Sequence, residues 1–348
     1  MNILERTLNA INHEEVYPVP VVLWDLAPWM PSMFNVNIKE YYQNFDLKLE
    51  TQLRLQETFP DALFFPGLHP DYGVTIEPSA FGGKIQWMEN DAPFVHPSIE
   101  TIKDIDKVKP IDPLNDGLMP VVLKEWRLLW EKVDRKVIEK YGYLNGHALC
   151  MGPSESAGLM LGYDKMFMGY YEDPARINRL LSIVTEETIK WVKYQEQING
   201  RLQKLFVIDH LSSQISPTHY KDFFHPYIKA IFDEFYYADV RLWHNEGRSQ
   251  HVYNEIKNLG CNVYNFGADD LAEIKNVIGD KICLMGNING VKLAREYSVN
   301  KVSEIALECV KIGGKNGGFL LSGGGGLAPG TTVEKVQAII DTSNSYTK

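Results

Sequence analysis

The sequence predicts an α/β protein, a (β/α)8 TIM barrel, from three observations. Eight short apolar runs recur along its 348 residues, each of a length that suits a buried strand. Segments with helical patterns separate these runs, and that alternation is typical of parallel βαβ units. Most of the runs end in glycine or polar residues. Eight such units indicate a closed barrel.

The eight predicted strands are rich in β-branched and aromatic residues. They span residues 19–25, 61–67, 144–152, 204–210, 240–247, 261–267, 281–287 and 318–323. Helical patterns are clearest at 174–197 and 302–313, and the first residues read as an amphipathic helix.

The second and third strands are joined by a much longer connection than the others. It predicts a lid-like insertion at 68–140, with a hairpin whose strands lie at 73–76 and 84–88. Since no linker or repeat interrupts the chain, residues 1–348 are expected to form one domain.

Composition and charge exclude several classes of protein. Hydrophobic residues make up 45% and charged residues 23%, which is ordinary for a globular protein. The formal charge of −10 argues against nucleic acid or an anionic membrane as the main partner. No 18-residue apolar stretch predicts a membrane span, and Glu5 and Arg6 interrupt any secretory signal. The four cysteines lie far apart, so we expect no disulfides and a cytoplasmic location.

Polar residues after the apolar runs are the first candidates for a site, because parallel barrels build their sites at the carboxyl ends of the strands. The candidates are Trp24, Asp25, His147, Asp209, His210, His244, Asn245, Glu246, Asn265, Asn287, Asn289, Ser322 and the glycines 323–326.

His244 and Glu246 form the sharpest pair. Residues two apart in a strand point to the same face, so an imidazole and a carboxylate could share one zinc ion there. The alternative is a hydrogen-bonded pair that only orients the rim of the barrel.

Asp209 and His210 follow one strand, and one of the two must face the barrel axis. An inward Asp209 would be a metal ligand, a general base or a substrate clamp. Otherwise it would cap a helix or close the strand end. His147 is a candidate general acid, although a single histidine in an apolar run also fits the core.

Two further segments carry alternatives. The glycines 323–326 resemble a phosphate cradle, but they also let a ligand or a metal site approach the backbone closely, which we favour. The stretch 23–34 (LWDLAPWMPSMF) reads either as core or as an apolar, aromatic-lined pocket.

The chain resembles the uroporphyrinogen decarboxylase superfamily, which includes the cobamide-dependent methyltransferases. The features that carry the resemblance span the whole chain: MGP at 151–153, YYEDP at 170–174, ID at 208–209, ISP at 215–217, FHPY at 224–227, LMGNIN at 284–289, GGFLLS at 317–322 and PGTT at 329–332. The family fold is a TIM barrel, in agreement with the strand count.

The resemblance separates two branches. The decarboxylases bind substrate carboxylates with arginines after the first strand, whereas residues 25–36 here hold no arginine or lysine, so porphyrinogen decarboxylation is not expected. The methyltransferases bind zinc with His-x-Cys and a later Cys. These positions align here with His244, Glu246 and about Gly325. The zinc site is therefore either lost or rebuilt, with Asp209, His147 and, last, Cys283 as replacement ligands.

The resemblance, with these departures from it, implies a corrinoid-dependent methyltransferase that moves a methyl group from a methoxylated aromatic donor to Co(I) of a separate corrinoid protein. Zinc would be held by His244 and Glu246, with Asp209 as a ligand or an orienting residue. His147 would protonate the leaving oxygen, and the substrate would be bound by Trp24, Asp25, Asn265 and Asn287. The alternatives are a methylcobamide:thiol methyltransferase of the coenzyme M type, a residual decarboxylase and a non-catalytic binding protein. A homodimer is compatible with the sequence.

Overall fold

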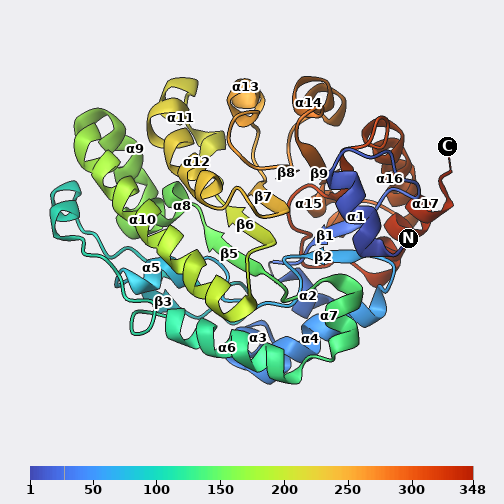
Figure 1. The fold of residues 1–348 in the computed structure, drawn as a ribbon, viewed down its shortest axis with the longest axis horizontal. Coiled ribbons are helices and arrows are strands. Elements are labelled where there is room, and N and C mark those ends of the chain that lie inside the picture. The colour runs from blue at the N-terminus through green and yellow to red at the C-terminus, as the bar shows by residue number, and fades with distance from the viewer. Residues whose placement is uncertain (27, 348) are drawn as a thin grey trace.

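Figure 1 shows the fold in a computed structural model that describes residues 1–26 and 28–347. Strands lie at the centre, helices surround them, and the two ends of the chain lie on the same side.

Eight parallel strands build the barrel, as predicted. Those before the insertion are β1 (Val22–Trp24) and β2 (Leu63–Phe65), which pair with each other. The others form one sheet in sequence order: β5 (His147–Met151), β6 (Lys204–Ile208), β7 (Val240–Asn245), β8 (Val263–Phe266), β9 (Cys283–Ile288) and β10 (Phe319–Gly323). Two isolated bridges, Val21 with Leu321 and Trp24 with Gly326, join β1 to β10.

The helices follow the strands around the outside of the barrel. Those in the first half of the chain are α1 (Ile3–Ile11), α2 (Trp29–Met33), α3 (Ile38–Gln43), α4 (Phe45–Thr58), α5 (Ile76–Ala80), α6 (Met119–Lys132), α7 (Arg135–Tyr141), α8 (Pro153–Leu161) and α9 (Tyr163–Glu172). Those in the second half are α10 (Pro174–Asn199), α11 (Pro217–Phe223), α12 (His225–Glu234), α13 (Tyr253–Ile256), α14 (Leu271–Ile278), α15 (Gly290–Arg295), α16 (Val299–Gly313) and α17 (Val333–Ser345). Short 3-10 turns span Ile102–Lys107, Leu211–Gln214 and Gln250–Val252.

The insertion between β2 and β5 contains an antiparallel hairpin, but not the predicted one. Its strands are β3 (Lys84–Gln86) and β4 (Phe94–His96), and the segment expected to supply the first strand begins α5 instead. The prediction failed because Glu77-Pro78-Ser79-Ala80 continues into a helical turn, which the neighbouring β-branched residues mask in the sequence.

A seam runs between β2 and β5, because among the described residues no ladder joins these two strands. Side chains saturate the free edge of β5 instead. Gln195 of α10 accepts the N–H of Leu149 at 3.1 Å and donates to its carbonyl at 2.9 Å, and Glu77 accepts the N–H of Met151 at 2.9 Å. Buried main-chain groups need such partners, so the insertion and α10 complete the barrel chemically.

The barrel interior is filled by aromatic side chains, so it is a core rather than a pore. The ring of Phe206 lies 6.3 Å from that of Trp24 and 5.1 Å from that of Phe65. All four cysteines are free and buried, in agreement with the expected absence of disulfides.

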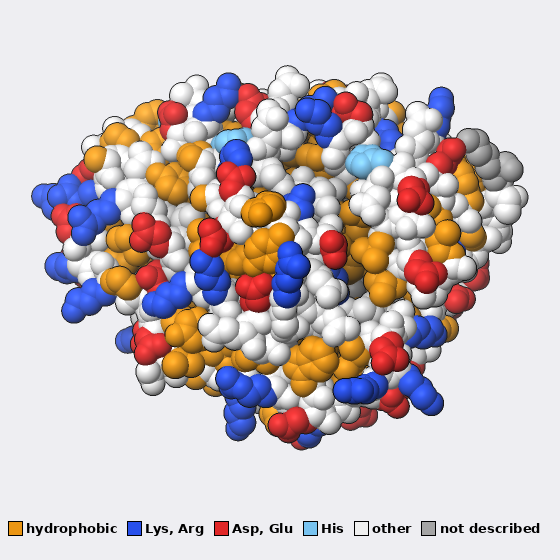
Figure 2. Space-filling model, in the orientation of Figure 1, with side chains coloured by type: hydrophobic (Ala, Val, Ile, Leu, Met, Phe, Trp, Pro, Cys, Tyr) orange, Lys and Arg blue, Asp and Glu red, His pale blue; other side chains and the backbone are white. Residues whose placement is uncertain are grey.

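The visible face of the molecule carries acidic and basic side chains interspersed with small hydrophobic groups (Figure 2). Within the described part of the chain, every helix is too short or too polar to cross a membrane.

Candidate functional site

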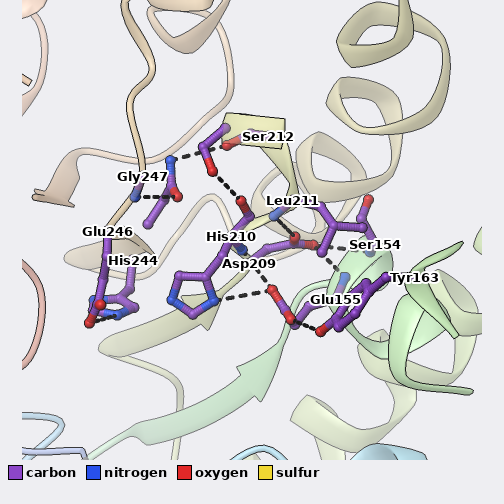
Figure 3. Close-up of polar contacts among 12 residues, drawn as sticks. Ser154, Glu155, Tyr163, Asp209, His210, Leu211, Ser212, His244, Glu246 and Gly247 are labelled. Atoms are coloured by element: carbon purple, nitrogen blue, oxygen red, sulfur yellow. Dashed lines mark hydrogen bonds and ion pairs between the residues drawn. The ribbon is translucent and has the colours of Figure 1, made fainter. Parts of the chain in front are cut away.

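Three side chains converge at the carboxyl ends of β6 and β7. One ligand atom from each of His210, His244 and Glu246 lies within 4.8 Å of the other two. His244 pairs in register with Ile208, so the residue two beyond Ile208 continues beside it as the strands end. The two histidines and the glutamate therefore meet through strand register (Figure 3).

His244 is held in one orientation and one tautomer. The amide nitrogen of Asn265 donates to the carbonyl of Met285 at 2.9 Å, so its oxygen faces Nδ1 of His244 at 2.6 Å. That oxygen can only accept, which places the hydrogen on Nδ1 and leaves Nε2 free, 3.4 Å from Glu246 Oε1. Trp24 stacks on the imidazole, with ring centroids 4.2 Å apart. Burial lowers the pKa of His244 and so favours the neutral ring.

Glu246 is seated by the glycine run after β10. Its Oε1 accepts the N–H of Gly326 at 2.8 Å. A Cβ on Gly325 would lie 2.3 Å from Cγ of Glu246 and 2.6 Å from its Oε1, so this position must lack a side chain. The glycines thus admit the Glu246 side chain close to the backbone. Burial opposes ionisation of Glu246, but the N–H of Gly326 and the positive charge favoured at His210 lower its pKa.

His210 supplies the third ligand atom. Glu155 bonds its Nδ1 at 3.1 Å, and the other ring nitrogen is turned toward His244 and Glu246 (Figure 3). Burial lowers the pKa of His210, but the hydrogen bond and charge of Glu155, together with the charges of Glu246 and Asp209, outweigh it and raise the pKa. The cluster therefore stabilises positive charge at this position.

Asp209 does not join the cluster, which corrects the expectation of a catalytic or ligating role. Its Oδ2 accepts the N–H groups of Ser154 and Glu155 at 3.0 and 3.2 Å, and its Oδ1 accepts that of Leu211 at 3.3 Å. The alternative reading, a helix cap, is thus the one the structure shows: Asp209 binds the first turn of α8. Burial and the charge of Glu155 raise its pKa to about 8, against these N–H donors.

His147 lies at the other end of its strand, so its assignment as the general acid was wrong. It opens β5, is fully buried, and packs between Trp126 and Phe206 with both ring centroids 5.0 Å away. The preceding turn explains the error: Leu144 and Gly146 both have positive φ, so the apolar run starts its strand at the histidine rather than ending there.

The other expected substrate-binding residues have structural partners. Asn265 and Trp24 hold His244, as described. Asp25 is 2% exposed and its Oδ1 accepts the N–H of Gly67 at 3.2 Å, which ties the end of β1 to the end of β2. Asn287 donates to the carbonyl of Asp269 at 2.8 Å and faces an outer pocket between α14 and α16, away from the cluster.

The first loop is core rather than pocket. Trp29 and Met30 are fully buried, and the indole N–H of Trp29 donates to the carbonyl of Trp24 at 3.2 Å. This settles the alternative left open for residues 23–34 at these positions in favour of packing.

The cluster fits a divalent cation by its chemistry. It combines a carboxylate whose pKa is depressed, a buried imidazole with a free Nε2, and a second imidazole surrounded by carboxylates. Two imidazoles and a carboxylate form a ligand set that zinc accepts in open sites. The sequence did not indicate that His210 joins this cluster or that Glu155 is its partner, because in the run LFVI both faces are apolar.

The parallel strands therefore carry a cluster of metal-ligand atoms at their carboxyl ends, which is where barrels of this fold build their active sites. The family model described as "Uroporphyrinogen decarboxylase (URO-D)" matches residues 3–346, and the chain belongs to this family.

Relatives within the family carry different names. A uroporphyrinogen decarboxylase of Trichodesmium erythraeum is 23% identical over 88% of this chain and 84% of its own length. A methylated-thiol–coenzyme M methyltransferase of Methanosarcina mazei is 22% identical over 78% of this chain and 70% of its own. A solved methyltransferase structure from Methanosarcina mazei superposes with a TM-score of 0.80 at 21% identity, covering 99% of this chain and 98% of that one.

Proposed function

We propose that this protein is a methyltransferase that moves a methyl group from a small methylated donor to Co(I) of a separate corrinoid protein. The observation that carries the proposal is the convergence of His210, His244 and Glu246 within 4.8 Å at the barrel mouth. The relative and the solved structure named as methyltransferases support the class of reaction. The absence of Lys and Arg from 25–36 argues against the decarboxylase reaction of the other relatives.

We propose zinc as the cation, with His244 and Glu246 as ligands and His210 as the third. Bound there, zinc would act as a Lewis acid on the atom from which the methyl group departs. The rest of the task falls to the chain: Asn265 and Trp24 hold His244, Gly326 holds Glu246, and Glu155 holds His210.

The ligand set favours an ether donor. Imidazole and carboxylate ligands give less electron density than thiolates, so the cation polarises an oxygen leaving group more strongly. A methoxylated aromatic compound suits such a site, because its oxygen leaves as a phenoxide. The electron pair of the C–O bond would leave with the oxygen, which would take a proton from solvent, and Co(I) of the partner protein would supply the electron pair for the new bond to the methyl group.

A methylcobamide:thiol reaction is the second candidate, and the name of the Methanosarcina mazei relative favours it. The ligand set opposes it, because no cysteine is among the three cluster residues.

Elemental analysis of protein purified without chelator is the first test, with His244→Ala/Glu246→Ala as the variant. We expect about one zinc per chain, lost in the variant, as for a three-ligand site. His96→Ala, which removes an exposed histidine of β4, is the control and should keep the metal.

Methyl transfer is the second test. Methoxyarenes are mixed with the protein and a reduced corrinoid protein, and the phenol and the change in the cobalt spectrum are followed. Methylation of coenzyme M by methylcobalamin in place of phenol release would establish the thiol candidate. A metal-free wild type with no methyl transfer would refute the proposal.

A further inference from the structure

The carboxylate of Glu155 in α8 makes two of its three side-chain hydrogen bonds with His210. The side chain is 8% exposed, and its Oε2 lies 2.8 Å from the main-chain nitrogen and 3.1 Å from ring Nδ1 of His210. Its Oε1 accepts the hydroxyl hydrogen of Tyr163. All three contacts are donors to the carboxylate, which can only accept when ionised.

We propose that Glu155 is a positioning residue that decides which nitrogen of His210 faces the cluster. Because Glu155 accepts from Nδ1, the hydrogen of the neutral ring stays there and Nε2 is left free beside His244 and Glu246 (Figure 3). The inference rests on the proposed function only in assigning a use to that free nitrogen.

Asp209 fixes the main chain at Glu155. Asp209 accepts the N–H groups of Ser154 and Glu155, and so locks the first turn of α8 against the loop that carries His210. The packing there leaves no slack, since a Cβ on Gly152 would lie 2.3 Å from Oδ2 of Asp209. Asp209, which was expected to be catalytic, thus acts on His210 indirectly, because it holds the helix that carries Glu155.

Tyr163 fixes the carboxylate of Glu155. It is the first residue of α9, and its ring is seated against α8, where a Cβ on Gly158 would lie 2.5 Å from its Cε1. Its hydroxyl holds the second carboxylate oxygen, so the carboxylate plane cannot rotate away from His210. Tyr163 is also 36% exposed, which makes it the point where the surface meets this chain of contacts.

His244 and His210 are therefore oriented by the same kind of contact. An acceptor oxygen holds Nδ1 of each ring, from Asn265 in one case and Glu155 in the other. In both cases the oxygen belongs to a side chain fixed by a further hydrogen bond, to Met285 and from Tyr163. Two rings set in this way direct both Nε2 atoms at one point, which is what a shared cation requires.

The test compares Glu155→Leu, which removes the acceptor, with Glu155→Gln, which keeps an oxygen for His210 while its NH2 donates to Tyr163. We expect the leucine variant to bind zinc about 10–100-fold more weakly in chelator competition, and the glutamine variant to stay close to wild type. Glu187→Leu is the matched control, because Glu187 is also buried and accepts a main-chain N–H, from Ile111 at 3.3 Å.

The tautomer of His210 is read directly by 15N NMR of metal-free protein, with the pH raised until the ring nitrogen shifts show a neutral imidazole, because the pKa of His210 is raised. We expect the hydrogen on Nδ1 in the wild type and the glutamine variant, and on Nε2 in the leucine variant. This measurement needs no variant to fold, because the wild type alone gives an answer.

Two results would overturn the inference: a hydrogen on Nε2 of wild-type His210, or, where the wild type binds zinc, the same zinc affinity in Glu155→Leu. A wild type with the expected tautomer but no affinity for zinc would refute the cation of the proposed function and leave the role of Glu155 supported.

Discussion

The buried charges on the β1/β2 side of the barrel bind one another, whereas those at the ends of β6 and β7 converge on a shared point. On the first side, Lys48 is 1% exposed and pairs with Glu125 at 3.0 Å, and the hydroxyl of Tyr72 donates to the other oxygen of Glu125 at 2.6 Å. On the second side, His210, His244 and Glu246 bring ligand atoms together and rely on residues behind them for orientation.

The difference separates two uses of polar groups in one barrel. A buried pair that is saturated within the chain holds elements together, here α4 with α6. In the cluster, hydrogen bonds from behind hold each side chain, while the remaining nitrogen or oxygen atoms face one another. Such an arrangement suits the binding of a group from outside the chain. Counting buried polar residues would not distinguish the two regions, but following their hydrogen bonds does.

Breaking the Lys48–Glu125 pair on the β1/β2 side should have the largest effect, a loss of stability. Lys48→Met leaves Glu125 buried without its cation, and we expect a loss of about 3–5 kcal/mol in the free energy of unfolding, measured in urea. Zinc content should not change. Lys48→Met/Glu125→Leu removes both charges and should recover most of the loss. A loss below about 1 kcal/mol in the single variant would contradict the distinction between the regions.

The seam offers a pH-dependent test on the same side. Burial raises the pKa of Glu77 to about 7, against the N–H of Met151. The native protein then binds a proton that the unfolded chain, with a glutamate pKa of about 4.3, has already lost. This stabilisation is complete at lower pH and is lost as the pH rises through 7.

Glu77→Gln keeps the acceptor for Met151 and removes the titration. Between about pH 5 and 7, the wild type should lose about 1 kcal/mol per pH unit relative to the variant. Parallel stability curves for the two proteins would show that Glu77 titrates normally.

The smallest effect is expected at the glycine that admits Glu246. Gly325→Ala brings a Cβ within 2.3 Å of Glu246 Cγ, so the carboxylate must move, and we expect zinc affinity to fall by about tenfold or more. Gly200→Ala is the control: its φ of +83° matches the +82° of Gly325, but nothing lies within 4 Å of its Cβ. Both should lose about 1 kcal/mol of stability, and only the first should lose affinity. Equal affinities would mean that Glu246 is not held by this packing.

The eight strands were predictable because parallel strands buried on both faces appear as short, continuous apolar runs. The His244/Glu246 pair was predictable because a spacing of two fixes a common face whatever the surroundings. The glycines at 323–326 also indicated their use, since only glycine admits a side chain so close to the backbone.

The same continuous runs hid what only the tertiary structure decided. In LFVI, apolar residues fill both faces, so no alternation shows that His210 points inward and Asp209 outward. The apolar run at 144–152 does not show that a turn occupies its first residues. Strand β5 therefore begins at His147, which places this residue at the end of the barrel opposite the cluster. The sequence by itself determined the barrel and the pairing of His244 with Glu246. The approach of His210 to this pair and its support by Glu155 depend on strand register and on the packing of α8, which bring together residues about 55 apart in the chain.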